Sequence, residues 1–129
     1  MNQKKVLFVD DDKFLLDMYA LKFSKASYEA KTADSGELAL KILHDGFVPD
    51  ILLVDIIMPG MDGLTFLEQV RKENMAAGAV VVFLTNQGEP DDINRARKLN
   101  ADGYIVKATT IPSEVLAEVE KIYQNKHRA

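Results

Sequence analysis

Acidic residues directly follow two short apolar runs of the sequence. Three consecutive aspartates, residues 10–12, follow one run, and Asp55 follows another. If these runs are parallel strands, their carboxyl ends meet at one edge of a sheet, where α/β proteins bind ligands. Clustered carboxylates repel one another unless a cation or protons compensate, and ligands that are all oxygen suit Mg²⁺. The sequence therefore predicts a magnesium site built largely by Asp10 and Asp11 beside Asp55.

Two further apolar runs end in a hydroxyl and an ammonium group, Thr85 and Lys107. A carboxylate can attack phosphorus, and phosphoryl transfer depends mainly on positioning and on neutralising the phosphoryl oxygens. Asp55 is then the predicted nucleophile, Lys107 and the cation neutralise two oxygens, and Thr85 donates a hydrogen bond to another. A single Asp after a strand is more often a loop residue or a helix N-cap, which is the interpretation we give Asp12.

The elements that must position these residues alternate along the chain. Four apolar runs are too short and too rich in β-branched or aromatic residues for helices, and each predicts a buried strand: residues 6–9, 51–54, 80–84 and 104–106. Residues 28–32 alternate apolar with polar side chains, which favours an edge strand. Helix-length segments follow at residues 13–25, 36–44, 63–73, 90–100 and 112–125. Strand then helix, five times over, predicts an α/β fold with a parallel sheet.

Length, composition and net charge exclude several classes of protein and partner. A chain of 129 residues can form one domain with a substantial core. The lack of cysteine excludes disulfides and thiol chemistry and fits the cytoplasm, which is the compartment we expect. A net charge of -4 argues against a broad nucleic-acid surface, and the first apolar run is far too short for a signal peptide or a membrane span. We therefore expect no direct nucleic-acid partner and no membrane partner.

Together the motifs resemble a known family. Residues 5–12 (KVLFVDDD), 52–63 (LLVDIIMPGMDG), 83–85 (FLT) and 101–107 (ADGYIVK) are similar to the receiver domains of two-component response regulators, the chemotaxis-type phosphoacceptors. The resemblance covers nearly the whole length. It implies a doubly wound, CheY-like and flavodoxin-like (βα)5 fold with strand order 2-1-3-4-5. It also implies a single receiver domain over residues 1–129, with no output domain in the chain.

The resemblance implies roles for single residues. Asp55 is the implied phosphoacceptor, and Thr85 and Lys107 contact the phosphoryl group. The implied Mg²⁺ ligands are Asp10, Asp11, Asp55 and the Ile57 carbonyl. Thr85 and Tyr104 are the implied switch, which remodels the face of the fourth helix, fifth strand and fifth helix for a downstream protein target. The implied donor is a sensor histidine kinase or a histidine phosphotransfer protein, and such a switch is no enzyme beyond its own phosphorylation and dephosphorylation.

Several positions depart from the family pattern. Ala108 stands where receivers usually have a proline after a cis peptide bond. A cis bond before a non-proline residue costs about 2.5 to 4 kcal/mol, so we expect a trans peptide and an altered loop. Asn86 is bulkier than the small residue that usually follows the threonine. Ile57 and Gln87 occupy the two positions that tune the access of water to the phosphorylated aspartate. The apolar Ile57 predicts slower self-dephosphorylation than in receivers with polar residues at both positions.

Two other functions stay open. A pseudo-receiver would keep the fold as a constitutive protein-interaction module, and Asn86 and Ala108 favour it. An aspartyl-phosphate phosphohydrolase would need a substrate-covering cap segment and a second Asp two residues after Asp55, and the sequence has neither.

The helix expected at residues 13–25 has a surplus of apolar side chains. They are Phe14, Leu15, Leu16, Met18, Tyr19, Leu21 and Phe23. One buried stripe needs fewer, so some of them point away from the core. The surplus side chains either form part of a surface that binds a partner or are simply exposed to solvent, as single apolar residues often are.

Overall fold

The sheet has five parallel strands in the expected order. The structure, a computed structural model, describes residues 3–86 and 90–127, without the side chain of Ala108. Its strands are β1 (Lys5–Val9), β2 (Glu29–Ala33), β3 (Ile51–Asp55), β4 (Val80–Thr85) and β5 (Gly103–Val106). They pair in the order β2-β1-β3-β4-β5, so the predicted α/β fold and strand order are confirmed.

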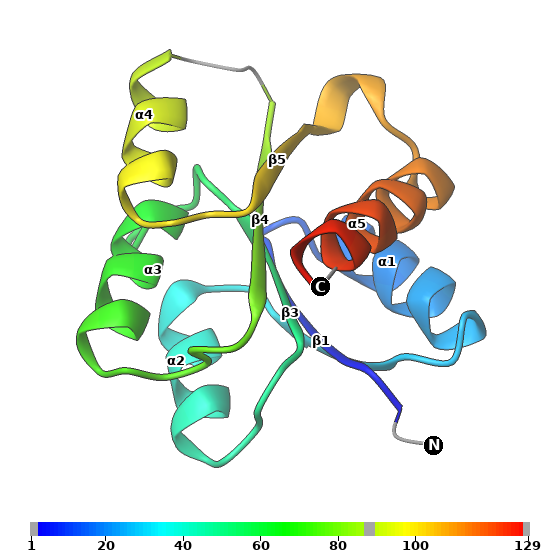
Figure 1. Cartoon of the computed structure of the whole chain (residues 1–129), viewed down its shortest axis with the longest axis horizontal. Helices are drawn as coiled ribbons and strands as arrows, with labels where there is room; N and C mark the ends of the chain where they lie inside the picture. The colour runs from blue at the N-terminus through cyan, green and yellow to red at the C-terminus, as the bar shows by residue number, and fades with distance from the viewer. Residues whose placement is uncertain (1–2, 87–89, 128–129) are drawn as a thin grey trace.

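Helices cover both faces of the sheet (Figure 1). They are α1 (Lys13–Lys25), α2 (Gly36–His44), α3 (Gly63–Lys72), α4 (Pro90–Lys98) and α5 (Pro112–Lys126), with a short 3-10 helix, η1 (Lys107–Thr109), before α5. Helices α1 and α5 pack on one face, and α2, α3 and α4 pack on the other. In the part of the chain that the structure describes, no helix combines the length and apolarity needed to cross a membrane.

The central strands are buried on both faces, which explains their continuous apolar runs. Leu52 and Val54 of β3 belong to the core formed with α2 and α3. Ile51 and Leu53 belong to the core formed with α1 and α5. A strand of this kind needs an apolar side chain at every position, so its sequence does not alternate.

The two edge strands differ from the prediction. The apolar run 104–106 predicts a buried strand, but within β5 only Ile105 is buried, and Tyr104 is 44% exposed. This prediction was wrong because β5 has one neighbouring strand, β4, and lies at the edge of the sheet. At the other edge, β2 begins and ends one residue later than predicted, because the Tyr28 N–H still donates to the Phe23 carbonyl at the end of α1, at 3.0 Å.

Side chains cap the starts of three helices, and the cap predicted at Asp12 is confirmed. Asp12, Ser35 and Asp62 each accept a hydrogen bond from the backbone N–H three residues later, at 3.2, 3.1 and 2.7 Å. The helix ends differ from the prediction by two residues or fewer. The described residues contain no cis peptide bond, so the trans peptide predicted between Lys107 and Ala108 is confirmed.

Gly63 determines how closely α3 can approach β3. A Cβ at this position would overlap the backbone carbonyl of Asp55 and would lie 3.0 Å from Val54 Cγ1. The Gly63 N–H also donates to the Ile56 carbonyl at 2.8 Å. Any side chain here would therefore push α3 away from the strand that carries Asp55.

We expect Gly63→Ala to lower the free energy of unfolding by about 2 kcal/mol, because the backbone of α3 or β3 must shift. Urea unfolding measures this loss. Gly78→Ala is the matched control, since nothing lies within 4 Å of a Cβ at that position. Equal losses in the two variants would contradict the close approach described for Gly63.

Candidate functional site

The predicted site residues meet at the carboxyl edge of the sheet. Asp10 and Asp11 follow β1, Asp55 ends β3, Thr85 ends β4 and Lys107 follows β5. This edge includes the point between β1 and β3 where the chain connections diverge, which is where doubly wound folds bind ligands. Asp10, Asp55 and Thr85 are buried, and Asp11 is exposed. The fold therefore brings together residues that are up to 97 positions apart in the sequence.

The Lys107 ammonium joins the two buried carboxylates. Its Nζ lies 2.9 Å from Asp10 Oδ2 and 3.4 Å from Asp55 Oδ2. The second oxygen of Asp10, Oδ1, accepts a hydrogen bond from the Asp12 N–H at 2.9 Å. The Lys107 side chain is only 9% exposed, so water screens these contacts far less than it screens a surface ion pair. Lys107 reaches both carboxylates although a trans peptide bond follows it.

Three carboxylates can each offer one oxygen to a metal ion. The oxygens of Asp10, Asp11 and Asp55 lie within 4.8 Å of one another. A single ammonium cannot balance three carboxylates, so the cluster retains negative charge. Oxygen ligands of this kind suit Mg²⁺, which proteins usually hold with one or two carboxylates, water and a phosphate. The donor set therefore fits a hard divalent cation.

Burial and neighbouring charges shift the ionisation of both partners in this ion pair. The pKa of Asp55 is raised to about 7, mainly by burial and then by the charge of Asp10, while Lys107 acts in the opposite direction. The pKa of Lys107 is also raised: burial lowers it, but the hydrogen bond to Asp10 and the charge of Asp55 outweigh burial. Lys107 therefore stays charged at neutral pH, whereas Asp55 needs more positive charge nearby to ionise fully.

Other predicted residues lie around the rim. Ile57 is 65% exposed, and Asn86 is exposed where the chain leaves β4. Gln87, the second position predicted to control water, lies outside the described residues. The roles of the Ile57 carbonyl as a ligand and of Thr85 and Tyr104 as a switch stay predictions.

Tyr19, which the sequence analysis names only among the apolar residues of the first helix, is a neighbour of the site. It is buried in α1, and burial raises the pKa of its hydroxyl. The charges of Lys107, Asp10 and Asp55 also act on this pKa, so Tyr19 lies near the ion pair. The available signal was the helical spacing between Tyr19 and Phe23, which are both buried and mark the inner stripe of α1.

The parallel sheet and the acidic pocket at its carboxyl edge define a CheY-like α/β domain. A family model described as the response regulator receiver domain matches residues 6–120, and the chain belongs to this family. It is 31% identical over 127 residues to a protein of Guillardia theta named "Probable transcriptional regulator ycf27", covering 98% of this chain and 48% of that protein. The chain spans about half the length of the curated relatives it matches.

Solved structures agree with this assignment. The chemotaxis protein CheY4 of Vibrio cholerae has a TM-score of 0.86 and 27% identity, covering 94% of this chain and 99% of that chain. The response regulator TrrA of Thermotoga maritima, solved in complex with Mg²⁺ and BeF, has a TM-score of 0.77 and 30% identity, covering 93% of this chain and 99% of that chain. Magnesium and phosphoaspartate are typical of this family. The acidic cluster of Asp10, Asp11 and Asp55 lies in the fold that this chain shares with the family.

The raised pKa of Asp55 predicts that its ionisation opposes folding when divalent cations are absent. Between its ordinary pKa of 3.8 and pH 7, the folded chain holds a proton that the unfolded chain has released. Stability therefore falls as pH rises through this range. Asp55→Asn removes this effect, so we expect the variant to exceed the wild type by about 2 kcal/mol at pH 8 in EDTA, and by little near pH 4.

Urea unfolding at the two pH values measures this difference. Asp17→Asn, which changes an exposed aspartate of α1, is the control for a general effect of charge. An advantage of Asp55→Asn that is the same at both pH values would count against the raised pKa.

Proposed function

We propose that this chain is a phosphorylatable signalling switch in which Asp55 accepts a phosphoryl group. The observation that carries the proposal is the contact of Lys107 with both Asp10 and Asp55, because it holds a positive charge beside the acceptor oxygen. Membership in the receiver family supports the same conclusion. The proposed donor is a sensor histidine kinase or a histidine phosphotransfer protein, and the proposed compartment is the cytoplasm.

In the transfer step, a carboxylate oxygen of Asp55 attacks the phosphorus of the donor phosphohistidine. The new phosphorus–oxygen bond forms, the phosphorus–nitrogen bond of the donor breaks, and the leaving imidazole nitrogen takes up a proton. Lys107 neutralises one phosphoryl oxygen, and the Thr85 hydroxyl donates a hydrogen bond to another. The proposed holders of Mg²⁺, which neutralises phosphoryl charge when bound, are Asp10, Asp11, Asp55 and the Ile57 carbonyl.

Exposed apolar residues near the site support docking of the donor along α1. Phe14, in the first turn of α1, is 74% exposed, and Leu21 and Ile111 are also exposed. Met18 and Leu21 contribute to a groove of about 230 Å³ between α1 and the start of α5. Because Met18 and Leu21 line the same groove, their exposure is grouped and favours a partner site, and we assign the surplus of α1 to this role.

The proposed output surface consists of α4, β5 and α5. Tyr104 is partly exposed on β5, and Thr85 pairs with Val106 between β4 and β5. A hydrogen bond from Thr85 to the phosphoryl group draws the end of β4 toward the site. Tyr104 can then turn inward, and a downstream protein recognises the changed face.

Acetyl phosphate with Mg²⁺ should add one phosphoryl group to the wild-type chain, detected by intact mass. Asp55→Asn should gain none, because it lacks the nucleophile, and EDTA should abolish the reaction of the wild type. Phosphotransfer from candidate kinases, with the same variant as control, then identifies the donor. A wild type that neither reacts with acetyl phosphate nor responds to beryllofluoride at Asp55 would instead be a pseudo-receiver.

We expect Ile57→Asn to shorten the lifetime of the phosphorylated chain roughly threefold or more, because an amide can orient the attacking water and the isoleucine side chain cannot. The decay of the phosphorylated mass after removal of acetyl phosphate measures the lifetime. Ile111→Asn is the matched control, since this isoleucine is also exposed but lies at the N-cap position before α5. No faster decay in Ile57→Asn would show that Ile57 does not limit access of water.

A further inference from the structure

Tyr19 brings a hydroxyl group into the core between α1, α5 and the sheet. The residue is 1% exposed, and its ring stacks on the Phe8 ring of β1, with centroids 5.6 Å apart and an angle of 18° between the planes. Within the described residues the Tyr19 hydroxyl forms no hydrogen bond, although the hydroxyl of a buried tyrosine usually has a partner. No described polar side-chain atom that is closed to solvent lacks a partner, so the Tyr19 oxygen keeps a small opening to solvent.

The ion pair of the acceptor site lies on the same face of the sheet as Tyr19. Leu53 of β3 packs with Tyr19 in the core that α1 and α5 cover. Asp55 ends the same strand two residues later, so its side chain points to the same face. Lys107 contacts Asp55 and Asp10, and the three charged groups therefore form the next layer of this core toward the carboxyl edge.

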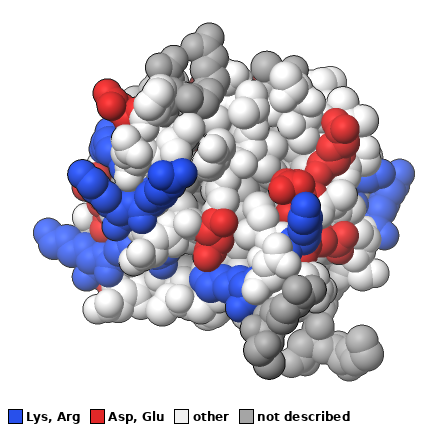
Figure 2. Space-filling model, turned by 45° about the horizontal axis from the view of Figure 1, so that its top comes forward, with Lys and Arg blue, Asp and Glu red and all other residues white. Residues whose placement is uncertain are grey.

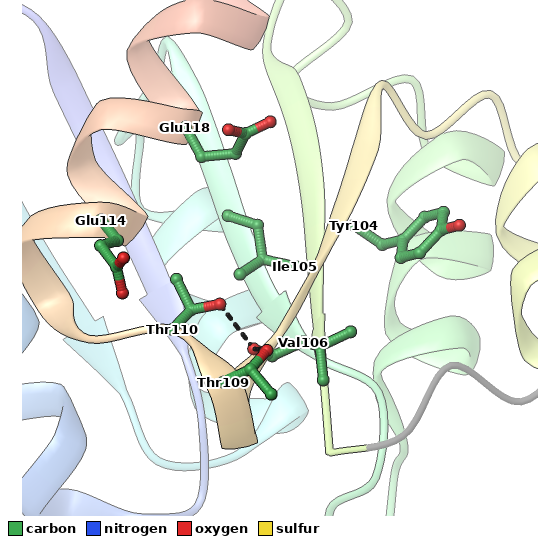
Figure 3. Close-up of a pocket in the computed structure, with 7 residues that line it drawn as sticks. All are labelled: Tyr104, Ile105, Val106, Thr109, Thr110, Glu114 and Glu118. Atoms are coloured by element: carbon green, nitrogen blue, oxygen red, sulfur yellow. Dashed lines mark hydrogen bonds between the residues drawn. The ribbon is translucent and has the colours of Figure 1, made fainter.

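β5 places Lys107 on this face in the same way. In Figure 3, which shows the groove of about 380 Å³ between β5 and the first turns of α5, Ile105 lies on the α5 side of the strand and Tyr104 extends to the other side. Lys107 follows Ile105 by two residues. The Thr110 hydroxyl donates to the Val106 carbonyl at 2.7 Å, and this hydrogen bond fixes the turn that carries Lys107.

The direction of α1 turns the Tyr19 side chain toward the ion pair. α1 begins at Lys13, just after the aspartates that follow β1, so its N-terminus lies at the carboxyl edge of the sheet. Helical side chains lean toward the N-terminus of their helix, and Tyr19 lies about 9 Å along the axis from that end. Burial raises the pKa of the Tyr19 hydroxyl, and among neighbouring charges that of Lys107 acts on this pKa most, in the opposite direction.

The Lys107 ammonium has one N–H more than its partners use. Asp10 and Asp55 accept two of its three N–H groups, and in the part of the chain that the structure describes they are its only acceptors. In the view of Figure 2, in which the carboxyl edge comes forward, most charged side chains stand on the two flanks of the surface, within reach of water. The Lys107 side chain is only 9% exposed, so its third N–H depends on an acceptor inside the core.

We propose that Tyr19 is a positioning residue of the acceptor site: one water molecule accepts the third N–H of Lys107 and donates to the Tyr19 oxygen, which keeps the ammonium directed at the carboxylates. No direct hydrogen bond joins the two side chains, and the opening to solvent at the Tyr19 oxygen admits the bridge. This contact accounts for the placement of Lys107, which reaches both carboxylates although a trans peptide bond follows it. The inference rests on the proposed function, because the reaction that Tyr19 affects is the phosphorylation of Asp55.

The test observes the Lys107 ammonium itself, in the full chain labelled with ¹⁵N at lysine, in EDTA and without a phosphoryl donor. Lys107→Gln identifies the signal by its loss. A positioned ammonium exchanges its protons with water slowly, so the wild-type signal should be visible at neutral pH. We expect Tyr19→Phe to shift this signal and to speed the exchange about threefold, because the bridging water loses its acceptor.

Tyr28→Phe is the matched control. It removes the hydroxyl of another buried tyrosine of the same core, which donates to Glu120 at 3.2 Å. Tyr28 directly precedes β2 and lies at the opposite edge of the sheet, so the Lys107 signal should not change. A signal that Tyr19→Phe leaves unchanged, that both variants change equally, or that fast exchange removes from the wild type would overturn the proposal.

A reciprocal measurement does not depend on the folding of Tyr19→Phe. In the chain labelled with ¹³C at tyrosine Cζ, Lys107→Gln should shift the signal of Tyr19 and leave that of Tyr28 in place, because only the first hydroxyl shares a water molecule with Lys107. Equal shifts of the two signals, or no shift of Tyr19, would contradict the bridge.

Reaction with acetyl phosphate and Mg²⁺, followed by intact mass, separates this inference from the proposed function. Tyr19→Phe should lower the maximal rate of phosphorylation about threefold and leave the half-saturating concentration unchanged, since Lys107 acts on the transition state more than on donor binding. Tyr28→Phe should react as the wild type does. An unchanged maximal rate in Tyr19→Phe overturns the positioning role alone, whereas a wild type that is not phosphorylated, but whose Lys107 signal depends on Tyr19, overturns the switch alone.

Discussion

The contact of Lys107 with Asp10 and Asp55 is the constraint on which the rest of the structure depends. Carboxylates at a buried sheet edge are stable as anions only when positive charge lies within a few ångströms. Lys107 supplies part of that charge, so β5 must run parallel to β4 and end at the same edge as β1 and β3. The remaining negative charge gives the site its fit for a divalent cation, and burial together with the charge of Asp10 raises the pKa of Asp55.

The fold meets this constraint because its central strands are buried and two helices begin at the same edge of the sheet. α1 begins just after the aspartates that follow β1, and α3 begins just after the loop that follows Asp55. The N-terminus of a helix carries partial positive charge, which favours anions nearby. Asp12 and Asp62 cap these two helices, while Gly63 lets α3 lie against the carbonyl of Asp55. The helix caps and the close packing of α3 on β3 thus both place partial positive charge near the carboxylates of the site.

Most of this arrangement could be predicted from the sequence because central strands and cap residues have local signatures. Runs without alternation mark strands buried on both faces, and such strands end at the site. Exposure at an edge has no such signature: the apolar run at residues 104–106 does not tell that Tyr104 faces solvent. The sequence also indicates that Lys107 belongs to the site, but not that its ammonium lies closer to Asp10 than to Asp55. That preference depends on where three strands place their ends, as does the groove between β5 and α5.

In the proposed switch, the shared contact of Lys107 limits how strongly a phosphoryl group on Asp55 can act on the proposed output surface. A phosphoryl group on Asp55 does not meet an unengaged lysine; it competes with Asp10 for an ammonium that already has a partner at 2.9 Å. The free energy available to move the loop after β5 is therefore the difference between two sets of contacts, not the full strength of the new one. A coupling of about 1 to 3 kcal/mol, common between linked sites, is consistent with such an exchange. The Thr110 hydroxyl holds the Val106 carbonyl at the end of β5, so the exchange must displace or rotate a turn that is already hydrogen-bonded. A loop held at both ends in this way favours a change between two defined positions over a continuous drift.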